Sequence, residues 1–248
     1  MVSLELVPRS IESLVKEAKQ ALSRYPELQY INIPDVIRLD IRSWEATEAL
    51  LRAGIPTIPH IRAMDHRGDQ LNFILKPLIE LGLEKVVIIS GDAPDFPDFK
   101  PSGETPITLT SSVKQAFPSL KVYGAVDPYR QNFKDEIAYV HKKIAAGMDG
   151  VFSQAFFDSR LLEIYLDQLE GITFFAGISP VNSEKSVKYW ERINQVVFPK
   201  KFDISIEANA KLANEILSMV KAKGQHAYLM PILISSEKYL KSFWGERD

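Results

Sequence analysis

Apolar residues recur along the chain in two alternating patterns. In stretches such as 11–22 (IESLVKEAKQAL) and 136–147 (EIAYVHKKIAAG) they return every three or four positions, which is typical of amphipathic helices. Several of these stretches end near a glycine, a common helix stop. Between them lie short runs rich in β-branched and aromatic residues. These runs predict eight strands, at residues 2–6, 29–33, 56–61, 85–90, 120–126, 149–154, 172–177 and 226–230.

The alternation of strands and helices predicts an α/β fold. A strand, helix, strand order favours parallel pairing through right-handed crossovers. Eight such units in 248 residues favour a single closed (β/α)8 TIM barrel. An open, doubly wound sheet stays as an alternative, because periodicity does not reveal whether a sheet closes. The segment between strands 7 and 8 has room for two helices, at 183–195 and 204–223, one more than the repeat requires.

Composition and charge narrow the class of protein. Hydrophobic residues make up 46% of the chain and no linker interrupts it, so we expect one domain over 1–248. The net charge of −2, without blocks of Lys and Arg, disfavours nucleic acid or an anionic membrane as partner. The absence of cysteine excludes disulfides and thiolate sites. With no signal-peptide or membrane-helix pattern, we expect a cytoplasmic protein.

Polar side chains end nearly every predicted strand. In a barrel the carboxyl ends of the strands meet on one face, where active sites lie. Glu5 and His60 are the most informative, because each stands among apolar residues, where an inward polar side chain needs a partner. The full set at these positions is Glu5, Asn32 with Asp35, His60, Asp92, Asp127, Gln154 and Tyr228.

Glu5 has two interpretations. It is structural if it faces outward or pairs with Arg9. If it points into the barrel between two leucines, its pKa rises and it can donate a proton near neutral pH. His60 fits a buried, hydrogen-bonded histidine. The other three histidines share no ligand spacing with it, so we predict no metal site and no zinc hydrolase.

The fourth strand runs into a long polar loop, residues 91–106 (GDAPDFPDFKPSGETP). Gly91 permits an unusual dihedral or a close approach to a flat ligand, after which Asp92 would project over the barrel mouth. An Asx turn after the strand is the simpler alternative. Loops of this length in compact domains are usually functional. We therefore predict that Asp92 is a second carboxylate of the site.

Five segments follow one another in order along the predicted barrel. They are SLELVPR at the first strand, PHIRAMD at the third, VVIISGDAP at the fourth, KKIAAGMDGVFSQAFFD across the fifth helix and sixth strand, and FFAGISPVNS at the seventh. Together they resemble the methylenetetrahydrofolate reductase family over nearly the whole chain. INIPD and SGDAP are similar to the short branch of that family, which consists of the catalytic domain alone.

The resemblance implies a flavoenzyme. In it NADH or NADPH reduces FAD, and reduced FAD converts 5,10-methylenetetrahydrofolate, or a related pterin, to the 5-methyl form. It implies Glu5 as general acid and Asp92 as the charge that tunes the flavin and holds the pterin, with Gln154 as a further substrate contact and His60, Ser90, Gly91 and Lys143 as cofactor contacts. From their places at the predicted strand ends we add Asn32, Ala125 and Asp127 as cofactor contacts, and Tyr228 as a substrate contact whose ring could stack on a ligand ring. On pattern alone, Lys143 is typical of a solvated helix face.

Two alternatives to this reductase stay open. The chain departs from the family after the fifth strand, where YGAVDPYRQN replaces Tyr-Pro-Glu-x-His-Pro, and after the eighth, where Pro231 and Ile232 replace Asn-Arg. A flavin-free pterin-binding relative that works with a corrinoid protein or a partner oxidoreductase subunit is the first alternative. An unrelated barrel acting on a phosphorylated metabolite is the second, and a weak one, because the loops after strands 7 and 8 are poor in glycine. A homo-oligomer is equally compatible with the sequence.

Overall fold

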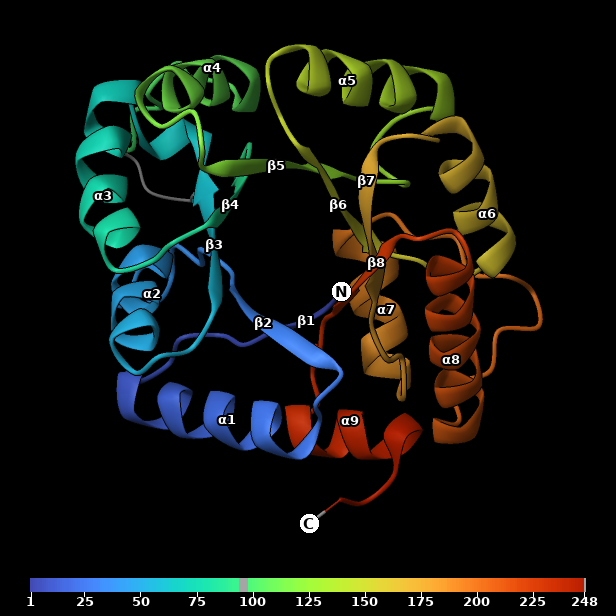
Figure 1. Ribbon diagram of the computed structural model, residues 1–248. Coiled ribbons are helices and arrows are strands. Elements are labelled where there is room, and N and C mark those ends of the chain that lie inside the picture. Colours follow the sequence, from blue (N-terminus) through green and yellow to red (C-terminus); the bar gives the residue numbers. More distant parts are fainter. Residues whose placement is uncertain (94–97, 248) are drawn as a thin grey trace.

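Eight parallel strands close into a barrel in which each strand pairs with its neighbours in sequence and β8 pairs back to β1. This computed structural model describes residues 1–93 and 98–247, so residues 94–97 of the predicted functional loop lie outside the described residues. In Figure 1 the strands form the inner ring and the helices surround it. The strands are β1 (Val2–Glu5), β2 (Leu28–Ile33), β3 (Thr57–Arg62), β4 (Lys85–Ile89), β5 (Lys121–Val126), β6 (Gly150–Ala155), β7 (Thr173–Ile178) and β8 (His226–Leu229).

The closed barrel confirms the predicted fold and excludes the open sheet. Each strand lies within about one residue of its predicted bounds, since runs of apolar residues mark buried parallel strands clearly. The two helices predicted between strands 7 and 8 are α7 and α8. The helices are α1 (Ile11–Arg24), α2 (Ser43–Arg52), η1 (Ala63–Asp65, a 3-10 turn), α3 (Gly68–Glu80), α4 (Pro106–Ala116), α5 (Phe133–Ala145), α6 (Ser159–Gln168), α7 (Glu184–Ile193), α8 (Ile206–Ala222) and α9 (Ser236–Trp244).

Side chains on successive strand residues pack on opposite sides of the barrel wall. Leu4 and Ile31 are fully buried in the layer between the wall and the helices. Phe152 and Phe175 belong to a separate cluster, with ring centroids 3.9 Å apart and ring planes 8° apart. Such layers of alternate-strand side chains fill the interior of TIM barrels. This packed interior forms a floor beneath the carboxyl ends of the strands.

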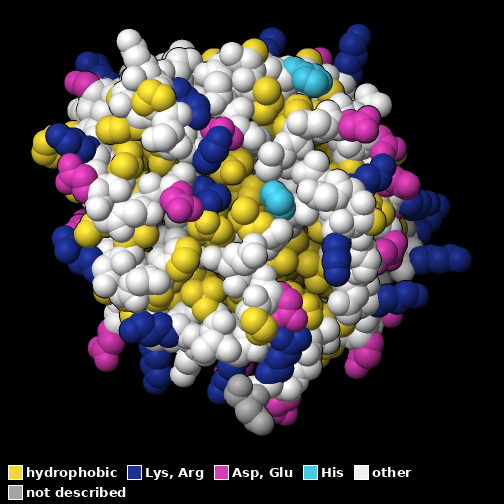
Figure 2. All heavy atoms as spheres, viewed as in Figure 1, with side chains coloured by type: hydrophobic (Ala, Val, Ile, Leu, Met, Phe, Trp, Pro, Cys, Tyr) yellow, Lys and Arg dark blue, Asp and Glu magenta, His cyan; other side chains and the backbone are white. Residues whose placement is uncertain are grey.

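Hydrophobic side chains are concentrated on part of the surface. Figure 2 shows them gathered near the centre of one face, with some charged side chains among them and many more around the edge. Several helices begin at a side-chain cap: Ser10, Asn132 and Ser205 each accept a hydrogen bond from a backbone N–H of the first turn. Within the described ranges, no helix combines the length and the apolar character needed to cross a membrane.

Candidate active site

A cavity of about 830 Å³ lies at the carboxyl ends of the strands. This volume falls in the range of small-molecule and cofactor pockets, about 300–1,000 Å³. The cavity brings together ten of the eleven predicted site residues, and Asn32 is the exception. The ten are Glu5, His60, Ser90, Gly91, Asp92, Ala125, Asp127, Lys143, Gln154 and Tyr228.

Glu5 ends β1 and faces the cavity, which excludes the outward-facing interpretation. The hydroxyl of Tyr228, on the neighbouring β8, donates a hydrogen bond to Glu5 Oε2. Burial raises the pKa of Glu5 to about 7, and the hydrogen bond from Tyr228 opposes this by a smaller amount. Burial and the adjacent carboxylate raise the pKa of Tyr228, so the phenol stays protonated. Glu5 can therefore both hold and release a proton near neutral pH.

Glu5→Gln is expected to flatten the pH dependence of stability. The pKa of Glu5 rises from 4.5 to about 7 in the folded protein, which therefore holds its proton to higher pH than the unfolded chain does. The free energy of unfolding thus falls as the pH rises from about 4.5 to about 7. Glutamine does not titrate. From pH 5 to pH 8 the free energy of unfolding should therefore fall less in the variant than in the wild type, by on the order of 3 kcal/mol. Urea denaturation at the two pH values measures this difference.

The control for this measurement is Glu12→Gln, which changes an exposed carboxyl group on α1. It should follow the wild-type dependence on pH. If Glu5→Gln follows it as well, Glu5 does not titrate between these pH values and cannot be the proton donor.

His60 lies on β3, lines the cavity and is hydrogen-bonded to Asn32. Asn32 Nδ2 lies 3.1 Å from His60 Nε2, and Asn32 is fully buried behind the ring. Burial lowers the pKa of His60 to about 4, so the ring is neutral at pH 7. With Asn32 Nδ2 as donor, His60 Nε2 accepts and the ring proton is on Nδ1. Asn32 therefore orients His60, and it does not line the cavity itself.

Gly91 places Asp92 at the cavity. Gly91 has φ +83°, and a Cβ there would lie 3.1 Å from the Cβ and Cζ atoms of Arg62. The backbone dihedral and this close approach both favour glycine. Asp92 follows with an exposed side chain that lines the cavity, next to Ser90. Glu5 and Asp92 thus line the same cavity, although Glu5 ends β1 and Asp92 lies in the loop after β4.

Lys143 is buried, so its interpretation from pattern alone as part of a solvated helix face is wrong. It is 4% exposed, and its Nζ donates a hydrogen bond to the backbone oxygen of Ala125. Gly124 leaves room here, because a Cβ there would lie 2.5 Å from Met148 Sδ and 3.1 Å from Lys143 Cδ. Lys143 Nζ also lies 4.1 Å from the ring centroid of Tyr139. Burial lowers the pKa of Lys143 to about 8.

Glu136 is a cavity residue that the sequence analysis missed. It is 3% exposed, and its carboxylate accepts hydrogen bonds from the Asp127 backbone N–H at 3.0 Å and from Gln131 Nε2 at 2.6 Å. These bonds fix the loop after β5, while burial raises the pKa of Asp127. Glu136 lies seven residues before Lys143, which puts both on one helix face. That spacing was a usable signal.

Asn194 is a second missed residue, and it contacts Gln154. Gln154 Nε2 donates to Asn194 Oδ1 at 3.2 Å, and both residues line the cavity. This bond leaves Gln154 Oε1 as the acceptor for a ligand. Asn194 caps the end of α7, and Gln195 follows with φ +56°, an uncommon conformation for a residue other than glycine. Forty residues separate Asn194 from Gln154, so spacing gave no signal.

The cavity therefore combines several chemical groups. Glu5 is a proton donor and acceptor near neutral pH, and Asp92 is a second carboxyl group. Arg130 and Lys142 add two exposed cations near α5, where an anionic group could bind. This set suits acid–base chemistry on a bound organic ligand.

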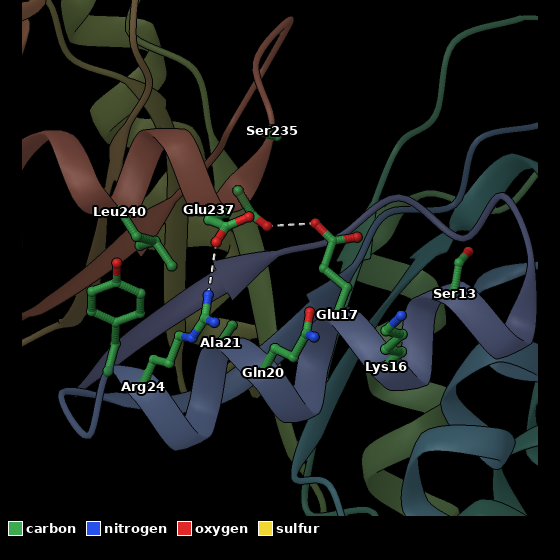
Figure 3. A pocket seen from close by; sticks show the side chains of 11 residues that line it. Ser13, Lys16, Glu17, Gln20, Ala21, Arg24, Ser235, Glu237 and Leu240 are labelled. Atoms are coloured by element: carbon green, nitrogen blue, oxygen red, sulfur yellow. Dashed lines mark hydrogen bonds and ion pairs between the residues drawn. The ribbon is translucent and has the colours of Figure 1, made fainter. Parts of the chain in front are cut away.

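A smaller hollow of about 260 Å³ lies outside the barrel, between α1 and α9 (Figure 3). Arg24 Nη1 lies 2.7 Å from Glu237 Oε1 across it, and Ser236 donates a hydrogen bond to Glu17. These contacts join the two helices. The hollow shares no lining residue with the barrel cavity, so we assign it a structural role.

Comparisons with known proteins agree with the resemblance in sequence. A family model described as methylenetetrahydrofolate reductase matches residues 1–225. The 5,10-methylenetetrahydrofolate reductase of Escherichia coli K12 is 25% identical over 154 residues, which cover 60% of this chain and 52% of the relative. The enzyme of Buchnera aphidicola subsp. Schizaphis graminum is 26% identical over 157 residues, covering 60% and 53%. The chain thus spans about half the length of the curated relatives it matches.

A solved structure has the same fold over nearly the whole of this chain. It is described as an uncharacterized protein from Clostridium thermocellum that binds two copies of 5-methyl-5,6,7,8-tetrahydrofolic acid. The two structures superpose with a TM-score of 0.72 at 14% identity, covering 98% of this chain and 93% of the other. At this identity the likeness concerns the barrel fold alone. The family match over 225 of the 248 residues carries the assignment: the chain belongs to the methylenetetrahydrofolate reductase family.

Proposed function

We propose that the protein reduces 5,10-methylenetetrahydrofolate, or a related pterin carrier, to its 5-methyl form with NAD(P)H and FAD. The observation that carries the proposal is Glu5, whose pKa of about 7 suits a proton donor, in a cavity that also contains Asp92. The reaction consumes one NAD(P)H, one proton and the methylene pterin, and it yields NAD(P)⁺ and the methyl pterin. A proton donor beside the pterin is therefore a chemical requirement.

The cavity residues fit FAD. Ser90 and Gly91 line the cavity, so a flat flavin ring could lie along their backbone. Arg130 and Lys142 suit the diphosphate, although the carboxyl groups of Asp127, Asp135 and Glu136 line the same part of the cavity. When bound, FAD would carry hydride equivalents from the nicotinamide to the pterin.

The chain's own residues would then bind the pterin and move one proton. Glu5 would protonate the nitrogen that leaves the methylene carbon when the five-membered ring opens. Tyr228 holds the Glu5 carboxyl group in place through its hydroxyl. Gln154 offers Oε1 to the pterin, and Asp92 holds the pterin and sets the charge near the flavin. The folate ligand named for the Clostridium thermocellum protein is consistent with this proposal.

Binding of FAD and of 5-methyltetrahydrofolate tests the proposal. Purified protein should retain added FAD through a desalting column, show a flavin absorption spectrum that NADH or NADPH bleaches, and bind 5-methyltetrahydrofolate in calorimetry. Binding of the folate without uptake of FAD would favour the flavin-free relative that needs a partner subunit. Binding of neither ligand would contradict the proposed function.

A further inference from the structure

Arg62 contacts the loop that carries Asp92, and no step of the proposed reaction uses Arg62. It ends β3 and is 5% exposed. Its Nη2 donates to the backbone oxygen of Asp92 at 2.6 Å, and its Nε donates to Asp65 Oδ2 at 2.9 Å. The guanidinium thus joins the Asp92 loop to the short helix η1.

Further hydrogen bonds join η1 to Ser90 and to Ser102, which lie before and after Asp92 along the chain. Met64 N–H donates to Ser90 oxygen at 3.3 Å, just before Asp92. Ser102 N–H donates to Met64 oxygen at 2.8 Å, and Ser102 Oγ donates to Ala63 oxygen at 2.9 Å. Among these contacts, Arg62 supplies the one that reaches Asp92 itself.

A chain of ion pairs compensates the buried charge of Arg62. Arg42 Nη2 lies 2.8 Å from Asp65 Oδ2 and 2.6 Å from Asp35 Oδ2. Asp65 therefore has two cationic partners, Arg42 and Arg62. Two acids and two bases balance one another, so the cluster adds no net charge to the cavity. Its structural consequence is to hold the Arg62 guanidinium in one orientation.

We propose that Arg62 is a positioning residue, which fixes the backbone at Asp92 so that the Asp92 carboxyl group is held over the cavity. Arginine suits this task because its planar fork can donate to Asp65 and to the Asp92 oxygen at the same time. The glycine at position 91 lets the guanidinium lie against the chain. The consequence for pterin binding rests on the proposed function, but the effect on the loop does not.

Hydrogen–deuterium exchange of the ligand-free protein tests the effect on the loop. Arg62→Met keeps the unbranched apolar stem but removes the guanidinium, and it leaves Asp65 paired with Arg42, so the buried acid keeps a partner. Exchange of the Met64 amide, which donates to Ser90 oxygen, and of the Ser102 amide, which donates to Met64 oxygen, should rise by about tenfold, while β1 and β8 stay as in the wild type. Arg62→Lys, which has one donor group in place of a fork, should give an intermediate result. Unchanged exchange in both variants would overturn the proposal.

A double-mutant cycle separates positioning from general destabilisation. Arg62→Met should weaken binding of 5-methyltetrahydrofolate by about tenfold in the wild-type background, and by much less in the background of Asp92→Asn, because the group it positions has already been altered. Arg52→Met, at an exposed arginine on α2, is the control. Equal losses in both backgrounds would show that Arg62 does not act through Asp92. If the wild type fails to bind the folate, the proposed function fails, and the exchange experiment still decides the role of Arg62.

Discussion

Glu5→Gln is expected to slow reduction of methylenetetrahydrofolate by at least about a hundredfold, the usual contribution of a general acid. Reduction of bound FAD by NAD(P)H should stay within about twofold of the wild-type rate, because only the pterin half-reaction needs the proton. Glutamine keeps the shape of the side chain and can still accept the hydrogen bond from Tyr228. Stopped-flow measurement of the two half-reactions separates the effects.

The dependence of the wild-type rate of pterin reduction on pH is a second measurement that reports on Glu5. Burial raises the pKa of Glu5 to about 7, so the acid is protonated below that value and ionised above it. The rate of pterin reduction should therefore fall as the pH rises through about 7, and Glu5→Gln should abolish this fall. Glu12→Gln is again the control. Equal loss of both half-reactions in Glu5→Gln would mean that the residue is structural.

Asp92→Asn is expected to raise the reduction potential of bound FAD and to weaken pterin binding about tenfold or more. Removing a negative charge near the ring favours the electron-rich reduced flavin, and for a two-electron couple about 30 mV corresponds to 1.4 kcal/mol. Replacing a carboxylate that accepts a hydrogen bond typically costs about 1.5–3 kcal/mol. Redox titration and calorimetry with 5-methyltetrahydrofolate measure the two effects.

Asp98→Asn is the matched control for Asp92→Asn. Asp98 is an exposed aspartate of the same loop and does not line the cavity. It should leave both the potential and the affinity close to wild type. If Asp92→Asn leaves the potential unchanged, Asp92 does not lie near the flavin, and its proposed role is wrong.

The sequence predicted the barrel and ten of the residues that line the cavity, mainly for one physical reason. A parallel strand buried on both faces is a short apolar run. The first polar residues after the run therefore mark the end of the strand, as Ser90 and Asp92 do after VVII. Closure of the barrel then brings these ends to one face. Glu5 stood out because a carboxyl group between two buried leucines needs a special environment.

Features that depend on contacts between distant segments were not predictable in this way. Nothing in the spacing indicates that Asn194 contacts Gln154, or that Arg62 reaches the backbone of Asp92. Lys143 looked solvated because helix periodicity does not show that Gly124 leaves room for its side chain beside β5. In each case the deciding partner comes from another element of the barrel.

The most direct test of the account is anaerobic turnover. Protein loaded with FAD and supplied with NAD(P)H and 5,10-methylenetetrahydrofolate should form 5-methyltetrahydrofolate in an amount equal to the NAD(P)H consumed, as measured by chromatography and absorbance. Protein that binds FAD and is reduced by NAD(P)H, yet forms no 5-methyl product from this folate, would contradict the claim that the cavity at the strand ends is a folate reductase site.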